Sequence, residues 1–253
     1  MIHTFYRESD SFLHSLDPRA KIVGFTSALV IILLFNDPIV TLTLFVSILL
    51  LGKILGKISL REQLGLLKPL IPLVVFTIIL WPIIYKPRLE GLVFGISFAF
   101  RLLALGLVTF LLLMTTKQRE LVQGFVRLGL PYEFGLTISI GLRYIPTLYI
   151  LTKNIMDAQK SRGWEMEKGN IIVRVKKMSA VMIPLLVASL KTAHELSIAL
   201  ESRAFGAGKK RTFLHDIKMG KRDYFAVTFS LLLLGLALYL RYGLGFGHIR
   251  LYG

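Results

Sequence analysis

The stretch LEGLVFGISFAFRLLALGLVTFLLLM, from Leu89 to Met114, decides the fold class of this chain. A helix needs about 20 predominantly apolar residues to cross the hydrocarbon layer of a bilayer, and this run is longer than that. Arg101 lies in its middle. An arginine at membrane depth is costly, so Arg101 either faces the protein interior or a polar crevice, or lies nearer the membrane interface than its place in the run indicates.

Two shorter apolar runs precede this span, at 22–35 and 39–51, and Asn36-Asp37-Pro38 separates them. Each has only about 14 residues, short of the roughly 20 that a crossing needs. They form either a thin or tilted hairpin of two short spans or a pair that is only half embedded. Asp17 and Pro18 form a good helix start before them, because the Asp17 side chain accepts bonds from free first-turn amides and Pro18 needs no donor there.

A third run, at about 66–85, contains Pro69, Pro72 and Pro82, and a last run covers about 224–240. Prolines free backbone carbonyls that lipid cannot satisfy, so we expect the third span to pack inside the bundle. In the whole chain 54% of the 253 residues are apolar, and the mean hydropathy is +0.66. These values, with the segregation of apolar residues into long runs, predict an all-α integral membrane protein with about five transmembrane helices.

The basic residues are unevenly placed along the chain, whose formal net charge is +16. Nineteen of the 31 lysines and arginines lie between Lys117 and Arg222, whereas only Lys86 and Arg88 lie between the third and fourth spans. This asymmetry follows the positive-inside rule, under which basic segments stay in the cytoplasm. The charge therefore reflects topology and does not indicate a nucleic-acid partner. The absence of cysteine excludes disulfides and thiolate metal sites.

The chain divides into three parts by the pattern of its charges. Residues 1–116 hold the N-terminal transmembrane helices, and no apolar signal-peptide core precedes them, so we expect a cytoplasmic N-terminus. From 117 to 222 charges interrupt the apolar residues every few positions, which is typical of long amphipathic helices on the cytoplasmic membrane surface. Residues 223–253 form a last transmembrane helix and a short tail.

One helix of the middle part carries a ridge of small side chains. Ser189, Ala193 and Ser197 recur every four residues, so they lie on one face of a helix. Such a ridge lets another helix approach closely. The sequence therefore predicts a helix-packing surface there.

Two arginine-centred tripeptides end the helical patterns of this part, Ser161-Arg162-Gly163 and Ser202-Arg203-Ala204. Gly163 suits a helix stop, because glycine readily adopts the left-handed conformation that releases the chain. One such tripeptide is explained as a helix end alone, since its arginine complements the negative end of the helix dipole. A pair of them in one basic segment instead favours two guanidinium groups that dock into acidic or carbonyl-lined grooves of a partner. Glu201 either orients the nearby arginine or is a solvated carboxylate.

Several motifs follow one another in a fixed order: Leu16-Asp17-Pro18-Arg19-Ala20-Lys21, Arg143-Tyr144-Ile145-Pro146, Ala158-Gln159-Lys160-Ser161-Arg162-Gly163 and Ala199-Leu200-Glu201-Ser202-Arg203-Ala204-Phe205-Gly206. By these motifs and its topology the chain resembles, over nearly its whole length, the transmembrane T component of energy-coupling factor (ECF) transporters, the EcfT/CbiQ/BioN family. The family's arginine motif is usually Ala-Arg-Gly or a close variant. This chain departs from it at Ser161, Ser202 and Ala204, where small side chains are kept.

The resemblance implies a non-catalytic subunit of an ABC importer in the plasma membrane of a prokaryote. Such T components bridge two cytoplasmic ABC-type ATPase subunits and a membrane-embedded, substrate-binding S component. Their two coupling helices are seated in grooves of the ATPases, which bind and hydrolyse the ATP, and no cofactor is bound by the T component itself. The S component determines which vitamin, or whether cobalt or nickel, is imported. On this chain the ATPase-docking motifs would be formed by Ser161, Arg162, Gly163, Ser202, Arg203 and Ala204.

Two functions other than transport are alternatives. An integral-membrane enzyme that modifies lipids would gather Arg101, Arg143, His194 and Glu195 around a lipid phosphate, but these residues have no acid–base or metal-ligand spacing. A membrane scaffold without transport activity also fits the composition. The basic segment 206–212 lacks the first glycine of a phosphate-binding loop. The sequence thus offers no catalytic centre and no metal site.

Overall fold

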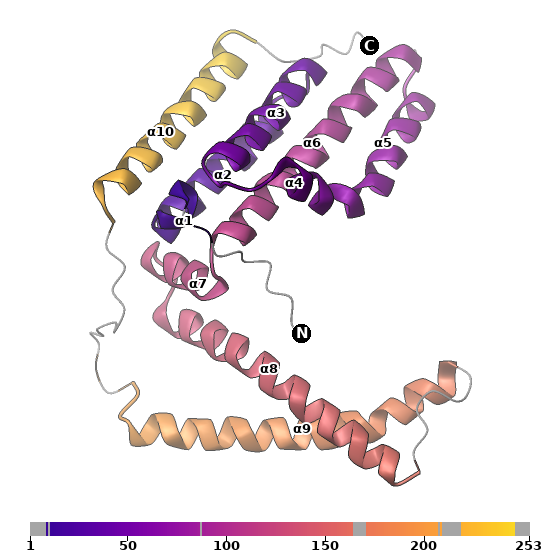
Figure 1. Cartoon of the computed structure of the whole chain (residues 1–253), viewed down its shortest axis with the longest axis vertical. Coiled ribbons are helices and arrows are strands. Elements are labelled where there is room, and N and C mark those ends of the chain that lie inside the picture. Colours follow the sequence, from indigo (N-terminus) through magenta and orange to yellow (C-terminus); the bar gives the residue numbers. More distant parts are fainter. Residues whose placement is uncertain are drawn as a thin grey trace. The chain divides into compact units, whose positions relative to one another are not determined.

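Figure 1 shows the computed structural model of the chain, which describes residues 9, 11–86, 88–163, 171–206, 208 and 219–245, with the backbone alone at 171–177. Within these ranges every regular element is a helix. They divide into two compact units, one with the described residues up to Gly135 and from Met219 onward, the other with those from Leu136 through Gly208. The predicted all-α fold is confirmed.

The N-terminal elements are α1 (Phe12–Ser15), α2 (Pro18–Leu34) and α3 (Pro38–Ile54). α2 and α3 begin in the same way: Asp17 Oδ1 accepts a hydrogen bond from the N–H of Arg19 at 2.8 Å, and Asp37 Oδ1 accepts one from the N–H of Ile39 at 2.8 Å. A proline follows each aspartate as the first helical residue. Proline lacks a backbone N–H, and at this position the helix does not use one. The predicted helix start at Asp17 and its proline is confirmed.

Both of these helices are longer than the apolar runs that indicate them in the sequence. Each has 17 residues, which at a rise of about 1.5 Å per residue gives a length of about 26 Å. The hydrocarbon layer of a bilayer is about 30 Å thick. The hairpin of α2 and α3 is therefore close to the length of a full crossing.

The turn between α2 and α3 is held by the side chains of α6 (Arg88–Thr115). The Arg101 guanidinium donates to the carbonyl oxygen of Phe35 and to the side-chain oxygen of Asn36, and lies 4.9 Å from the centre of the Phe98 ring. Ser97 Oγ donates to the Asn36 carbonyl oxygen at 2.5 Å. Carbonyls in a non-helical turn lack helical partners and need others from the protein. Arg101 therefore faces the protein interior, as the first of the two sequence-based alternatives has it.

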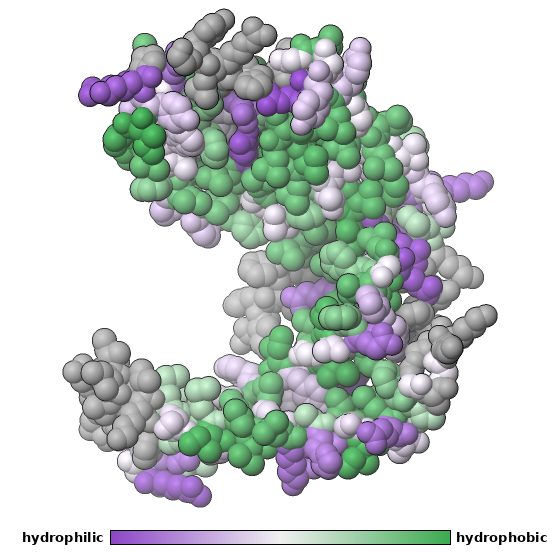
Figure 2. Space-filling view, turned by 180° about the vertical axis from the view of Figure 1, so that it is seen from behind, coloured by the Kyte–Doolittle hydropathy of each residue, from purple (hydrophilic) through white to green (hydrophobic). Residues whose placement is uncertain are grey.

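The third predicted span consists of α4 (Leu60–Leu67), the 3-10 turn η1 (Lys68–Leu70) and α5 (Ile71–Ile84). The expectation that it packs inside the bundle is wrong. α5 has no buried residue, and its Ile79 and Ile83 are 58% and 71% exposed. Pro69 and Pro72 stand at the starts of η1 and α5, where a missing N–H leaves no carbonyl unsatisfied. In Figure 2, apolar residues cover much of the visible molecular surface.

α6 is the central helix of the first unit and packs against α2, α3, α4 and α5. Its small residues permit close approach to α5: a Cβ added at Gly91 would lie 2.7 Å from the carbonyl oxygen of Trp81, and one at Gly95 would lie 3.2 Å from the Cα of Ile78. This Gly-x-x-x-Gly spacing places both glycines on one helix face. Further along α6 a core cluster is buried between the helices, formed by Ile32, Phe45, Ile48, Leu67, Ala104, Leu107 and Val108.

Two further helices complete the first unit, α7 (Gln118–Arg127) and α10 (Lys221–Leu238), and α10 continues into a π-helical turn, η2 (Tyr239–Gly243). Both α7 and α10 pack against α2. α7 approaches closely at Gly124, where an added Cβ would lie 2.9 Å from Ile22 Cδ1. α7 thus packs within the first unit, whereas the charge pattern places 117–222 among the cytoplasmic or membrane-surface helices. The boundary between the two units lies at Gly135 and Leu136.

The second unit is built from two long helices, α8 (Tyr132–Ser161, from Leu136 onward) and α9 (Ile171–Ser202). They cross each other (Figure 1), and at the crossing Gln159 Nε2 donates to the Ala180 carbonyl oxygen at 3.2 Å. Each continues as one helix through an internal proline, Pro146 in α8 and Pro184 in α9. Because they meet at a crossing, most of both helices is left available to other partners.

Five described helical segments are long and apolar enough to cross a membrane, as predicted in number: Leu60–Ile84, Arg88–Thr115, Tyr132–Ser161, Met178–Ser202 and Lys221–Gly243. They are not the same five. α8 and α9 qualify because each contains a long apolar stretch with few charged residues. α3, with 17 residues, is apolar but shorter than these segments.

Candidate functional site: two arginine-capped helix ends

The first arginine tripeptide ends α8 as the sequence predicts. Ser161 is the last helical residue, Arg162 follows it, and Gly163 has a φ of +80°. The N–H of Gly163 donates to the carbonyl oxygen of Lys160 at 2.9 Å, and the N–H of Arg162 donates to that of Gln159 at 3.1 Å. A residue in the left-handed region just beyond the last turn is the common way to stop a helix and satisfy its free carbonyls.

The second tripeptide ends α9 with the same geometry. Ser202 is the last helical residue, and Ala204, two residues on, has a φ of +54°. The N–H of Ala204 donates to the carbonyl oxygen of Glu201 at 2.9 Å, and the N–H of Phe205 donates to that of Leu200 at 3.0 Å. These two bonds form a Schellman motif, and Arg203 occupies its C-cap position.

Arg162 and Arg203 therefore hold equivalent positions, each directly between the last helical residue and a left-handed one. Both side chains are exposed. The serines before them bond back to their own helices: Ser161 Oγ donates to the Asp157 carbonyl oxygen at 3.1 Å, and Ser202 Oγ to that of Ala199 at 3.0 Å. The two helix ends thus present an exposed guanidinium beside a side chain too small to cover it.

Glu201 makes a contact other than the one considered from the sequence. Its carboxylate accepts a hydrogen bond from Ser197 Oγ at 3.2 Å, on the exposed side of α9. Within the described part of the chain no ion pair joins Glu201 to Arg203. Arg203 is accordingly placed by the backbone of the helix end and not by this carboxylate.

The small-residue ridge runs partly along open surface. Ser189 is half-buried, and its hydroxyl donates to the Leu185 carbonyl oxygen at 2.7 Å, whereas Ala193 and Ser197 are exposed. The ridge is therefore accessible to another helix over most of its length. Its role in helix packing stays a prediction.

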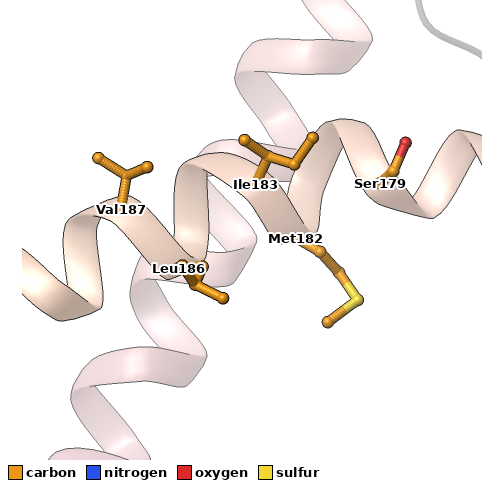
Figure 3. A pocket seen from close by; sticks show the side chains of 5 residues that line it. All are labelled: Ser179, Met182, Ile183, Leu186 and Val187. Atoms are coloured by element: carbon orange, nitrogen blue, oxygen red, sulfur yellow. The ribbon is translucent and has the colours of Figure 1, made fainter.

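The sequence pattern predicts an apolar stripe on α9 that includes Met182 and Leu186, but not which part of it stays uncovered. A hollow of about 260 Å³ is lined by Ser179, Met182, Ile183, Leu186 and Val187, and Figure 3 shows these side chains along one stretch of the helix. The four apolar ones are each between 59% and 64% exposed. The signal was available as a run of apolar residues between the basic ones, but amphipathicity alone does not tell which face stays uncovered.

The residues of the enzyme alternative do not form a site in the described regions. Arg101 is engaged with the α2–α3 turn, while Arg143 on α8 and His194 and Glu195 on α9 are exposed. No group of three or more metal-ligating side chains occurs among the described residues.

The two helix ends differ in one respect that gives a testable prediction. Glycine adopts a positive φ without strain, whereas alanine there costs about 1 kcal/mol. We therefore expect Ala204→Gly to stabilise the end of α9 by about that amount and Gly163→Ala to destabilise the end of α8 similarly. Hydrogen–deuterium exchange of the last-turn amides measures both effects, and shifts of the same sign in the two variants would contradict the shared geometry.

Comparison with known proteins identifies the family. The sequence model of the cobalt transport protein family, CbiQ, matches residues 9–213. The chain is 34% identical to the energy-coupling factor transporter transmembrane protein EcfT of Acidaminococcus fermentans, in an alignment that covers 94% of this chain and 96% of that protein. It is also 34% identical to EcfT of Lactococcus lactis subsp. cremoris, with coverages of 88% and 91%. For EcfT of Heliobacterium modesticaldum the identity is 35%, with coverages of 88% and 90%.

These matches confirm the resemblance drawn from the motifs and give no support to a lipid-modifying enzyme. They run through both compact units and include both arginine-capped helix ends. Together with the long apolar helices they describe a multi-pass membrane protein. The chain belongs to the CbiQ/EcfT family of energy-coupling factor transporter transmembrane proteins.

Proposed function

We propose that this chain is the coupling subunit of an ECF importer and transmits the movement of two ATPase subunits to a substrate-binding S component. The observation that carries the proposal is the pair of equivalent helix ends, each with an exposed arginine at its C-cap. Arg162 and Arg203 would each dock in a groove of one ATPase. A planar guanidinium on a fixed helix end suits this role, because it binds carboxylates or carbonyls through several directed hydrogen bonds.

The S component would sit on the exposed apolar face of α9. Met178, Met182, Ile183, Leu186, Val187 and Leu190 are all at least 50% exposed. A contiguous apolar surface of this kind marks a binding site for another protein or for the membrane. Methionines let such a surface adapt to its partner, which fits a seat that releases its occupant during each cycle.

In this proposal the chain itself performs no chemistry. ATP is bound and hydrolysed by the ATPase subunits, and the chain needs no cofactor. The protein lies in the plasma membrane of a prokaryote with its N-terminus and its basic middle part in the cytoplasm. The cargo is a vitamin, cobalt or nickel, selected by the S component.

The direct test is reconstitution. We expect the tagged chain to co-purify with two ABC-type ATPase subunits and a small membrane protein. In liposomes this complex should take up one member of a panel of labelled vitamins, Co²⁺ and Ni²⁺ when ATP is supplied to the ATPase side. The chain purified alone should hydrolyse neither ATP nor lipid. Turnover of a phospholipid by the chain without partners would overturn the proposal.

A further inference from the structure

Three parts of the first unit meet in a buried polar cluster at one end of the bundle. They are the start of α2, the end of α6 and the start of α10. The charged members Asp17, Lys21 and Asp223 are only 5%, 8% and 7% exposed. Burying charges is costly unless hydrogen bonds satisfy them. Hydrogen bonds hold Lys21 and both oxygens of Asp223, whereas Asp17 Oδ2 has no partner among the described residues. We call these three residues the joint.

Asp223 connects α10 to α2. Its Oδ1 accepts a hydrogen bond from the backbone N–H of Asp17 at 2.7 Å, across 206 positions of sequence. Its Oδ2 accepts one from the N–H of Gly220 at 2.7 Å. One carboxylate thus fixes the start of α10 to the start of α2, and both N–H donors lie at positive helix N-termini that favour its negative charge.

Lys21 connects α2 to α6. Its Nζ donates to the carbonyl oxygen of Thr115, the last residue of α6, at 2.8 Å, and to that of His14 at 3.1 Å. A lysine carries several donors on a flexible stem, so it can hold the free carbonyls of two separate helix ends. Asp17 and Lys21 lie one helical turn apart. Asp17 therefore bonds to α10, and Lys21 bonds to α6.

The two attachments lie at either end of the chain segment that includes the second unit. From Thr115 the chain continues through α7, which itself packs on α2, and it leaves the first unit at Gly135; after α9 it returns at Gly220 to begin α10. Movement that travels along the chain from α8 or α9 therefore reaches the bundle through α7 and the end of α6, or through the start of α10. All three contact the first turns of α2.

We propose that the joint is the point at which movement of the coupling helices enters the membrane bundle, so that α2, α6 and α10 shift together. Asp17, Lys21 and Asp223 are then positioning residues for transport. This inference rests on the proposed coupling function. Without the joint, α6 and α10 would move independently, and ATP hydrolysis would continue without moving the bundle as one body.

Asp223→Asn tests the joint with little change of shape. An amide can accept only through its oxygen, so one of the two N–H groups that Asp223 holds would face a donor. We expect the reconstituted complex to keep its ATPases and its ATP hydrolysis, while uptake per ATP falls at least about tenfold, equivalent to about 1.4 kcal/mol. Lys21→Met keeps the stem but removes the bonds to Thr115 and His14, and the same loss is expected.

Asp37→Asn is the matched control. Asp37 also begins a 17-residue helix next to a proline and accepts a backbone N–H, but among the described residues that donor is Ile39 of its own helix. We expect its uptake per ATP to stay close to that of the wild type. If the Asp223 and Lys21 variants behave like this control, the inference is wrong.

A second measurement separates transmission from simple stability. The chain has no cysteine, so Thr109→Cys on α6 and Phe225→Cys on α10, both exposed, can be spin-labelled before assembly. The distance between the labels should stay narrowly distributed with and without nucleotide, and should broaden on nucleotide binding only in the Asp223 and Lys21 variants.

The possible failures are distinguishable. If both joint variants lose the ATPases, the joint serves assembly and the inference is overturned. If the wild-type chain itself does not bind ATPases, it is the proposed function that fails.

Discussion

Charge reversal at both arginine-capped helix ends, Arg162→Glu with Arg203→Glu, is expected to release the ATPase subunits from the purified complex. Losing one partner of a desolvated charge pair at an interface costs about 2–5 kcal/mol, which is roughly 30-fold or more in affinity for each arginine. Reversal adds repulsion if the ATPase grooves are acidic or carbonyl-lined. Both ATP-driven uptake and co-purification should therefore be lost, while the chain still inserts in the membrane because both side chains are exposed.

The matched control keeps the same charge change within the same helices. Lys153 and Lys191 are exposed positions in the interiors of α8 and α9, away from their ends. We expect Lys153→Glu with Lys191→Glu to retain both ATPases. Equal loss in the two double variants would mean that net charge of the second unit matters and the helix ends do not. Retention of partners and uptake by the Arg162 and Arg203 variant would overturn their docking role.

The largest effect on stability is expected from Gly91→Leu. A Cβ at this position would lie 2.7 Å from the Trp81 carbonyl oxygen and 2.8 Å from Pro82 Cα, both backbone atoms of α5. Backbone cannot yield by a rotamer change, so α5 must separate from α6, which costs about 3 kcal/mol or more. For a chain of this size that lowers the apparent Tm in detergent by roughly 6–12 °C.

Gly235→Leu in α10 is the control for this substitution. In the described part of the chain, nothing outside the adjacent backbone of α10 lies within 4 Å of a Cβ added there. We expect its apparent Tm to stay near the wild-type value or rise slightly, because leucine favours helix more than glycine does. Similar melting of the two variants would show that α5 and α6 are not in the close contact described.

Features governed by neighbouring residues were predictable from the sequence. The start of α2 at Asp17 and Pro18 and the end of α8 at Gly163 both follow from local backbone chemistry, and both were predicted correctly. The end of α9 was predicted at Ser202 and Arg203. The positive φ of Ala204 was not predicted, because alanine rarely adopts this conformation and its identity does not indicate it.

Features that depend on partners distant in sequence were predicted poorly or left open. The prolines of the third span indicated an interior helix, yet α5 packs chiefly against α6 and leaves Ile83 71% exposed. The charges of α7 indicated a surface helix but did not indicate that it packs on α2 at Gly124. In both cases the local pattern records which residues tolerate lipid or water, and it does not record which neighbour a helix meets.

The sequence by itself determined that the chain is an all-α membrane protein, to which family it belongs, and where the helices with Arg162 and Arg203 end, because apolar run length and helix termination are local properties. Only the tertiary structure decided that Arg101 holds the α2–α3 turn and that Asp223 bonds to the backbone of Asp17. These contacts join residues 66 and 206 positions apart. They exist because buried carbonyl, N–H and charged groups must find partners, and packing alone determines which partner lies within reach.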